Sequence, residues 1–140
     1  EVGSVIAERL RERGARQVVG YGFGAHPLVC SVLAVSEGDE FKGGLIREER
    51  KEHGRRRLVE GPIDADQPVV MVDDIINSGR SASEALRLVR SAGFAVDGLL
   101  TLFNFTWSNG QDRIEAEGLW VDSLLDLNLQ EGTGSGSDSA

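Results

Sequence analysis

The sequence lacks what would build a disulfide framework, a membrane span or a nucleic-acid-binding surface. It holds one cysteine in 140 residues, so no internal disulfide forms, and a reducing, cytoplasmic location is expected. No apolar run reaches the roughly 18 residues that a transmembrane helix needs, so no membrane partner is expected. The formal net charge of -8 argues against a nucleic-acid partner, because phosphate backbones bind basic residues. A soluble, single-domain globular protein is therefore expected.

Positive charge is scarce overall but concentrated in one segment. Residues 47–57 contain six Lys or Arg against three Glu. Charge runs are usually solvated loops, and on composition alone this segment needs no other explanation. The lone Cys30 lies among apolar residues, and we expect it to be buried and unreactive.

Short apolar runs alternate with amphipathic stretches, which predicts an α/β fold. We expect an open, mostly parallel twisted sheet flanked by helices. The expected strands are residues 17–23, 41–47, 58–59, 69–72, 96–105 and 119–121, and the expected helices begin near Val2, Pro27 and Ser81. Residues 48–57 would then form the long, flexible tip of a hairpin. Residues 1–128 form the core domain, and the Gly/Ser-rich residues 129–140 are expected to be a disordered tail.

The segment after the apolar run Val69–Val72 has the composition of a sugar-phosphate site. Asp73 and Asp74 follow the strand and must point to opposite faces, because successive strand side chains alternate. Small polar residues and a glycine then lead into a helix, where Ser81 and Glu84 predict a capping box. Free N–H groups at a helix start bind anions, and carboxylates bind sugar hydroxyls. The simpler interpretation is a strand-to-helix turn with two exposed acids.

This order of residues resembles the 5-phosphoribosyl-1-diphosphate (PRPP) signature of type I phosphoribosyltransferases, most closely that of orotate phosphoribosyltransferase. The resemblance spans about residues 18–127 and implies the type I phosphoribosyltransferase fold. It implies an enzyme that transfers a 5-phosphoribosyl group from PRPP to a nitrogen base, with Mg²⁺ held at Asp73 and Asp74. The PRPP-binding residues that it implies are Asp73, Asp74, Ile75, Ile76, Asn77, Ser78, Gly79, Arg80, Ser81, Gly24 and Ala25.

Two further segments carry the same resemblance. Residues 20–28 are similar to the family's first glycine-rich turn, which contacts the diphosphate. Residues 47–54 are similar to its mobile catalytic loop, which reaches the neighbouring subunit's site and so implies a homodimer. Arg47, Lys51 and His53 match that loop and would act with Asp73 as the catalytic residues, by neutralising the departing diphosphate.

The sequence departs from the orotate enzymes on the acceptor side. Glu48 stands where the loop's first Lys is expected. Phe105 stands where an Arg would bind the orotate carboxylate, and Asn77 replaces a usual Thr. Asn77 and Phe105 are the residues expected at the acceptor base. The sequence also opens on the helix before the first core strand, without the segment that covers the base in the family. We therefore expect orotate to be a poor acceptor.

Three alternatives stay open at this point. Residues 20–25 fit a loose dinucleotide-binding pattern, but the acidic residue expected about 20 positions later is not in the right context. His26 and His53 lie too far from Cys30 and from each other to suggest a metal site, and His26 is expected to be a turn residue. A non-catalytic regulator of the same fold, which senses PRPP or nucleotides, is the stronger alternative.

Overall fold

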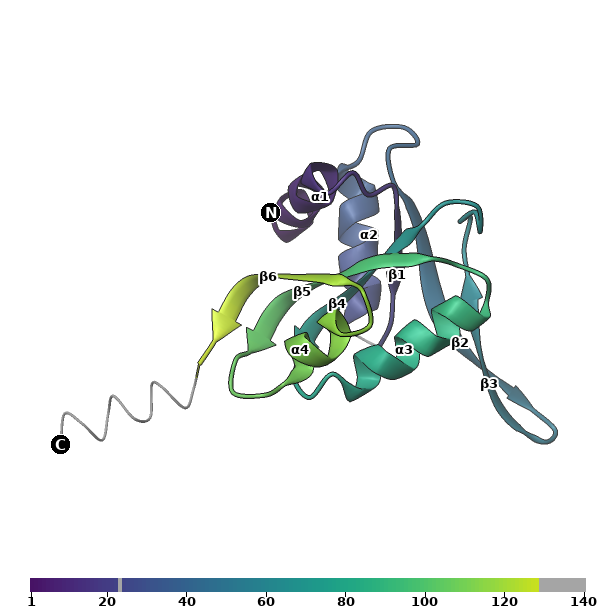
Figure 1. Cartoon of the computed structure of the whole chain (residues 1–140). Helices are drawn as coiled ribbons and strands as arrows, with labels where there is room; N and C mark the ends of the chain where they lie inside the picture. The colour runs from purple at the N-terminus through teal and green to yellow at the C-terminus, as the bar shows by residue number, and fades with distance from the viewer. Residues whose placement is uncertain (23, 129–140) are drawn as a thin grey trace, which may run out of the picture.

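The computed structural model describes residues 1–22 and 24–128, and it is built around one six-stranded sheet (Figure 1). The strand order is β3-β2-β1-β4-β5-β6, and all neighbours are parallel except the antiparallel pair β2 and β3. The strands are β1 (Gln17–Gly20), β2 (Lys42–Lys51), β3 (Gly54–Glu60), β4 (Val69–Ile76), β5 (Val96–Phe105) and β6 (Trp120–Leu127). The expectation of an open, mostly parallel sheet is confirmed.

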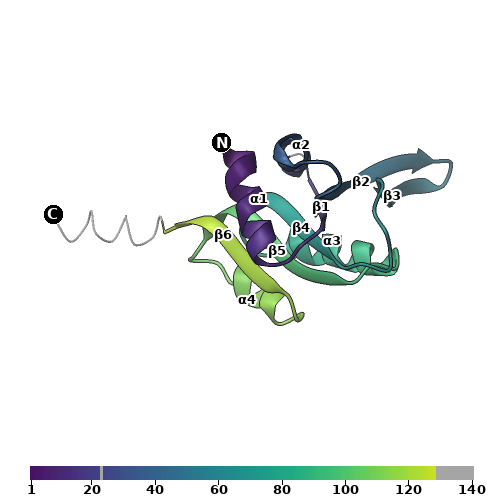
Figure 2. The ribbon, with the colours of Figure 1, turned by 90° about the horizontal axis from the view of Figure 1, so that it is seen from above.

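Helices cover both faces of the sheet, as a parallel sheet requires. The helices are α1 (Val2–Glu12), α2 (Ala25–Val35), α3 (Arg80–Ser91) and α4 (Gly110–Glu115). Figures 1 and 2 show α1 and α2 on one face and α3 and α4 on the other. Each of the first three helices buries one apolar stripe against the strands, as Ile6 and Leu10 do in α1 and Leu86 and Val89 do in α3.

The first half of β4 lies at the centre of the core. Val69 and Met71 pack in the cluster beneath α3, whereas Val70 and Val72 pack in the cluster beneath α1 and α2. All four are at most 2% exposed, so the strand is buried on both faces, as its continuous apolar run predicts. This central strand delivers the residues that follow Val72 to one edge of the sheet.

Three local expectations are wrong. β4 does not end at Asp73 but continues to Ile76, because β5 supplies ladder partners as far as Asn104. β6 is longer than residues 119–121 for the same reason, since it pairs with β5 up to Leu127. Helix α3 begins at Arg80 with Gly79 as its N-cap and no side-chain capping bond, so the capping box does not form. The short helix α4 was not expected.

The charged segment is a paired hairpin and not a long open tip. The ladder between β2 and β3 continues from Arg47 opposite Leu58 to Lys51 opposite Gly54, which leaves only Glu52 and His53 in the turn. Backbone hydrogen bonds form the ladder, and charged side chains on a two-stranded ribbon can extend into solvent. The hairpin projects from the body of the molecule in Figure 1.

Cys30 is exposed, contrary to expectation. It lies on the outer side of α2, because Val29 and Val32 take the buried side of that helix. Within the described residues no helix combines the length and the apolar composition needed to cross a membrane. The predicted tail at residues 129–140 lies outside the described part of the chain.

Candidate active site

The two unusual turns of the sequence meet at one edge of the sheet. Strands β1 and β4 are parallel neighbours, with Gly20 paired to Val72. The glycine-rich turn after Gly20 and the acid pair after Val72 therefore leave the sheet side by side. Ligands of open α/β sheets bind at this carboxyl edge, and the predicted convergence of the two turns is confirmed.

A cavity of about 460 Å³ opens at this edge, between the glycine-rich turn, the base of the hairpin and α3. Asp73 lies in its wall, together with residues that three different elements contribute. The lining residues are Tyr21, Gly22 and His26 from the turn and α2, Ile46, Arg47 and Glu48 from β2, and Ser81, Glu84, Ala85 and Leu88 from α3. Sequence reasoning singled out Arg47, Asp73 and Ser81 among them as site residues.

The carboxyl groups of Asp73 and Asp74 both approach the glycine-rich turn and interact with each other, so the expectation that they point to opposite faces of the sheet is wrong. A methyl carbon added at Gly22 would lie 3.7 Å from Asp73 Oδ1, whereas one added at Gly24 would collide with the carboxyl group of Asp74. Only a residue without a side chain fits between the turn and Asp74. The Asp74 amide also donates a hydrogen bond of 2.8 Å to Asp73 Oδ1.

Burial changes the protonation of Asp73 in the free protein. Among the described residues Asp73 is the one charged residue that is buried, at 8% exposed. Loss of solvation and the neighbouring Asp74 raise the pKa of Asp73 to about 7, against an opposing effect of hydrogen bonds from the Asp74 amide and Tyr21. Burial and the charge of Asp73 also raise the pKa of the Tyr21 hydroxyl, which stays protonated. A buried acid with a raised pKa is typical of a functional site.

The loop between β4 and α3 has the geometry of an anion site. Gly79 has a φ of 81°, a left-handed conformation that glycine adopts without strain, and it starts the 12-residue helix α3. The first N–H groups of a helix lack partners within the helix and carry its positive dipole end. Ser108 holds the loop from behind by donating a hydrogen bond to the Asn77 carbonyl oxygen. Ile76 anchors it in the core at 2% exposed.

The base of the hairpin contributes to the cavity. Arg47 and Glu48 line the cavity, and Arg47 Nη2 also donates a hydrogen bond of 2.6 Å to Glu60 Oε1. Glu48 thus brings a carboxylate to the place where the family pattern has a lysine. Lys51 ends β2 and His53 is exposed in the turn, so both residues belong to the tip of the hairpin.

The residue expected at the acceptor base lies at the end of β5. The Phe105 ring stacks on the Trp107 ring with a centroid separation of 4.5 Å and an interplanar angle of 21°. Trp107 is 40% exposed, so the pair presents an aromatic surface to solvent. Neither ring lines the cavity that holds Asp73.

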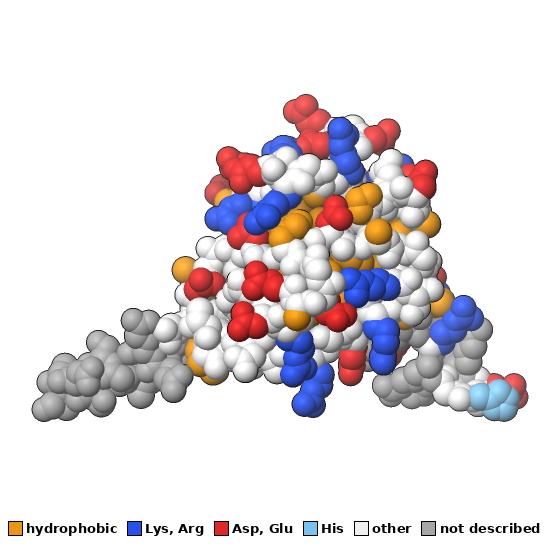
Figure 3. Space-filling model, in the orientation of Figure 1, with side chains coloured by type: hydrophobic (Ala, Val, Ile, Leu, Met, Phe, Trp, Pro, Cys, Tyr) orange, Lys and Arg blue, Asp and Glu red, His pale blue; other side chains and the backbone are white. Residues whose placement is uncertain are grey.

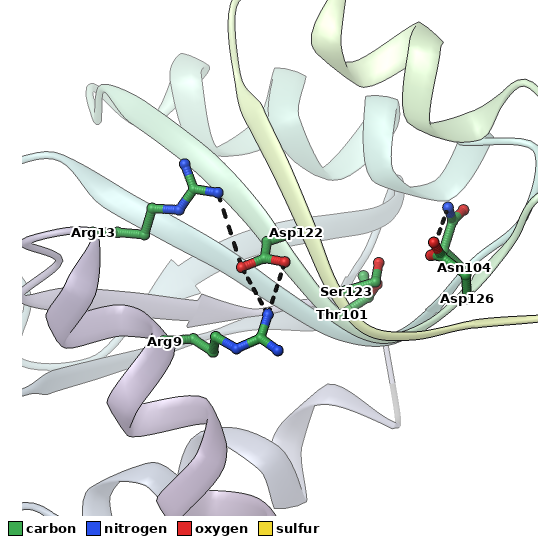
Figure 4. A network of polar contacts seen from close by, with 7 residues as sticks. All are labelled: Arg9, Arg13, Thr101, Asn104, Asp122, Ser123 and Asp126. Atoms are coloured by element: carbon green, nitrogen blue, oxygen red, sulfur yellow. Dashed lines mark hydrogen bonds and ion pairs between the residues drawn. The ribbon is translucent and has the colours of Figure 1, made fainter.

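Other polar clusters serve the fold. Asp122 on β6 receives hydrogen bonds from Arg9, and Arg13 lies within 3.9 Å, so both tie α1 to the edge strand (Figure 4). Thr101 and Asn104 of β5 bond their partners Ser123 and Asp126 on β6 in the same view. Each of these pairs is satisfied within the protein, and none lines the Asp73 cavity.

A second cavity, of about 650 Å³, lies between α3 and α4 and contains Arg87, Arg90 and Arg113. Basic and acidic side chains mix on this side of the molecule, which faces the viewer in Figure 3. It is the larger of the two cavities, but it holds none of the residues expected in the site. Arg90 there is already paired with Glu117. We therefore place the candidate site at Asp73.

The carboxylates of Asp73 and Asp74 are suitable ligands for Mg²⁺. This ion binds hard oxygen ligands and commonly uses one or two carboxylates, with water and substrate phosphates completing its shell. Asp73 and Asp74 supply two carboxylates, and burial raises the pKa of Asp73, an effect that a bound cation would oppose. Among the described residues no group of three or more His, Cys, Asp or Glu side chains could hold a metal ion by itself.

Comparison with known proteins identifies the family to which the chain belongs. No model of a protein family matches the sequence. The orotate phosphoribosyltransferase of Rhodopirellula baltica is 33% identical over 127 residues, covering 88% of this chain and 65% of the relative. That of Corynebacterium glutamicum is 30% identical over 127 residues, covering 91% and 68%. The chain thus spans about two thirds of the length of these relatives.

A solved structure shows the same similarity. The crystal structure of Mycobacterium tuberculosis orotate phosphoribosyltransferase in complex with PRPP superimposes with a TM-score of 0.75 at 27% identity, covering 90% of this chain and 71% of that one. The sequence match to Corynebacterium glutamicum covers 91% of this chain and the structural match covers 90%. The chain belongs to the orotate phosphoribosyltransferase family, within the type I phosphoribosyltransferases.

Proposed function

We propose that this protein binds PRPP with Mg²⁺ in the Asp73 cavity and transfers the 5-phosphoribosyl group to a nitrogen base. The observation that carries the proposal is the position of Asp73. It is a buried acid at the carboxyl edge of a parallel sheet, beside a glycine-rich turn and the start of α3. The relatives' names and the PRPP complex of a structural neighbour support the same reaction.

The parts of PRPP match the chemistry of the elements around the cavity. The loop at residues 77–81 and the start of α3 offer N–H groups and the Ser81 hydroxyl to the 5′-phosphate. Asp73 and Asp74 would accept hydrogen bonds from the ribose hydroxyls and hold Mg²⁺ beside them. Backbone N–H groups at the start of α2, near Gly24 and Ala25, would bind the diphosphate.

The reaction needs positioning and charge neutralisation more than covalent chemistry. A nitrogen lone pair of the base attacks C1 of the ribose, the bond from C1 to the diphosphate oxygen breaks with its electron pair, and the base nitrogen loses its proton where it carries one. When bound, Mg²⁺ would offset negative charge on the diphosphate. Arg47 adds positive charge at the cavity wall, and the protein holds the reactants in line and excludes water.

We also propose that the hairpin completes the site of a second copy in a homodimer. Support comes from the position of Lys51 and His53 at the tip of the hairpin. A hairpin that projects from the body has the reach for a neighbouring site (Figure 1). Lys51 and His53 would then neutralise the departing diphosphate in the partner.

An assay of diphosphate release tests the function. PRPP, Mg²⁺ and one base at a time, with orotate, uracil, adenine and hypoxanthine as the panel, should give nucleotide and diphosphate in equal amounts for at least one base. Asp73→Asn should abolish this turnover, and omission of Mg²⁺ should do the same. Binding of PRPP without turnover on any base would instead indicate a regulatory protein that senses PRPP.

A further inference from the structure

The cavity between α3 and α4 gathers arginine side chains that the proposed PRPP site does not use. It has a volume of about 650 Å³ and lies on the face turned to the viewer in Figure 3. Arg87 and Arg90 come from α3, and Arg113 comes from α4. Small-molecule sites in proteins commonly have volumes of about 300–1,000 Å³, so the cavity is large enough for a ligand.

Positive charge exceeds negative charge in this cavity, although the whole chain has a formal charge of -8. Three arginines lie there with two glutamates. Arg90 donates one hydrogen bond of 3.2 Å to Glu117 Oε1 and another of 2.8 Å to the Glu117 carbonyl oxygen, so this ion pair is satisfied. The other acid, Glu84, also lines the Asp73 cavity and therefore lies on the border between the two.

Arg87 and Arg113 are the cations that remain for a ligand. Both are exposed, and neither guanidinium group forms an ion pair or a hydrogen bond within the described part of the chain. They approach the cavity from different helices. Like charges that share a cavity repel each other, and a bound anion would offset this repulsion.

The start of α4 packs on the loop before α3 and so keeps Arg113 near α3. A methyl carbon added at Gly110, the first residue of α4, would collide with the Asn77 carbonyl oxygen. One added at Gly79, the N-cap of α3, would lie 3.3 Å from Arg113 Cδ. The aliphatic part of Arg113 therefore passes close to the beginning of α3, and the cations of the two helices meet in one cavity.

We propose that the cavity between α3 and α4 is a second anion site, which binds a small molecule with two or more linked phosphate groups. One phosphate group contacts Arg87 and another contacts Arg113, because the two free cations come from different helices and each guanidinium group donates paired hydrogen bonds to phosphate oxygens. Ser83 lines the same cavity and adds a hydroxyl donor. No arginine is shared with the Asp73 cavity, so the inference goes beyond the proposed function and does not depend on it.

Calorimetric titration with inorganic triphosphate tests the site. EDTA replaces Mg²⁺ in the buffer, so that metal-dependent binding at Asp73 does not contribute. Arg87→Gln and Arg113→Gln each remove one cation and keep a polar side chain. Arg16→Gln is the matched control, because Arg16 is exposed and lines neither cavity. The thermal midpoint of each ligand-free variant shows that it is folded.

Wild type should bind triphosphate, and Arg87→Gln and Arg113→Gln should each weaken it about fivefold or more, since each loses hydrogen bonds to a charged ligand. Arg16→Gln should stay within about twofold of wild type. Inorganic phosphate should bind wild type at least about tenfold more weakly than triphosphate, because one phosphate group does not reach both arginines. Tighter binding of ATP than of triphosphate would identify a nucleotide as the ligand, and equal binding would identify a polyphosphate chain.

A variant with the opposite effect adds a second test. Glu117→Gln releases Arg90 from its ion pair and should tighten triphosphate binding about two- to fivefold. Glu60→Gln is its control, because it changes the charge equally but releases Arg47 at the other cavity. Tightening by Glu60→Gln and not by Glu117→Gln would place the triphosphate in the Asp73 cavity and overturn the inference.

Two further results would overturn it. One is the absence of saturable triphosphate binding to wild type, which would leave the proposed PRPP function intact. The other is equal weakening by Arg16→Gln, Arg87→Gln and Arg113→Gln, which would show that only net charge matters. If triphosphate binds through Arg87 and Arg113 but wild type does not bind PRPP with Mg²⁺, the proposed function fails and this inference stands.

Discussion

Arg47 Nη2 lies 2.6 Å from Glu60 Oε1, so the cation at the base of the hairpin is held by an acid on the neighbouring strand. Both side chains are about half exposed. The same arginine lines the Asp73 cavity, where a diphosphate would compete with Glu60 for it. We therefore expect the strength of PRPP binding to depend on Glu60, a residue outside the cavity.

Glu60→Gln should tighten PRPP binding. An exposed ion pair contributes about 0–1 kcal/mol, so releasing Arg47 from it should lower the Kd about two- to fivefold at low salt. Calorimetry measures this, with Glu117→Gln as the matched control, because Glu117 pairs with Arg90 at the other cavity and loses the same charge. Equal tightening in both variants would show that only net charge matters.

The stability of the metal-free protein should fall as the pH rises from about 4 to about 7. Asp73 has a higher pKa in the folded chain, about 7, than its ordinary value of 3.8, so the folded state binds the extra proton across this range. Three pKa units correspond to about 4 kcal/mol, which is an upper limit because Asp73 borders a solvent-accessible cavity.

Urea unfolding at several pH values, without Mg²⁺, measures this dependence. The wild-type free energy of unfolding should decline toward pH 7 more steeply than that of Asp73→Asn, whose side chain does not titrate. Parallel curves for the two proteins would show that Asp73 is ionised at its ordinary pKa. Tyr21→Phe should extend the decline to higher pH, because the Tyr21 hydroxyl stabilises the ionised form of Asp73.

If the hairpin of one subunit completes the site of the other, two inactive variants should restore activity when they form mixed dimers. Lys51→Ala removes a hairpin cation and Asp74→Asn removes half of the acid pair, so a mixed dimer has one site with both groups intact. Activity should recover toward one quarter of wild type in a random mixture, since half of the dimers are mixed and each has one of two sites. Verified mixed dimers without any activity would contradict sharing.

Orotate should be a poor acceptor. Phe105 stacks on Trp107 and offers no donor to a carboxylate, and a carboxylate desolvated against aromatic rings is disfavoured. We expect kcat/KM for orotate to fall below about 10⁴ M⁻¹s⁻¹, the low end for ordinary enzymes. Phe105→Arg alone should restore it only in part, because Glu48 also departs from the pattern. A higher wild-type value would show that Phe105 does not exclude orotate.

The sheet was predictable because its apolar runs are unambiguous. Val69–Val72 has the composition of a strand buried on both faces, and the parallel order follows from the alternating helices. The glycine-rich turn and the acid pair then had to meet at one edge. The fold and the position of the site at that edge follow from these few residues.

The ends of the elements were not predictable, because partners far along the chain set them. Asp73 and Asp74 stay inside β4 only because β5 continues beside them, and the hairpin pairs as far as Lys51 through backbone bonds that charged side chains do not reveal. The burial of single residues was hard to predict for a similar reason. Cys30 is exposed, because the rotation of α2 about its own axis depends on packing against the sheet.

The most direct test of the account is a calorimetric titration of Mg²⁺ and PRPP into wild type and into Asp73→Asn. The account predicts saturable binding to wild type with one PRPP per chain. It predicts binding at least about tenfold weaker for the variant, because the buried carboxylate that holds the ribose hydroxyls and the metal is gone. No binding to wild type at millimolar PRPP, or the same Kd for both proteins, would contradict the claim that Asp73 forms the centre of a PRPP site.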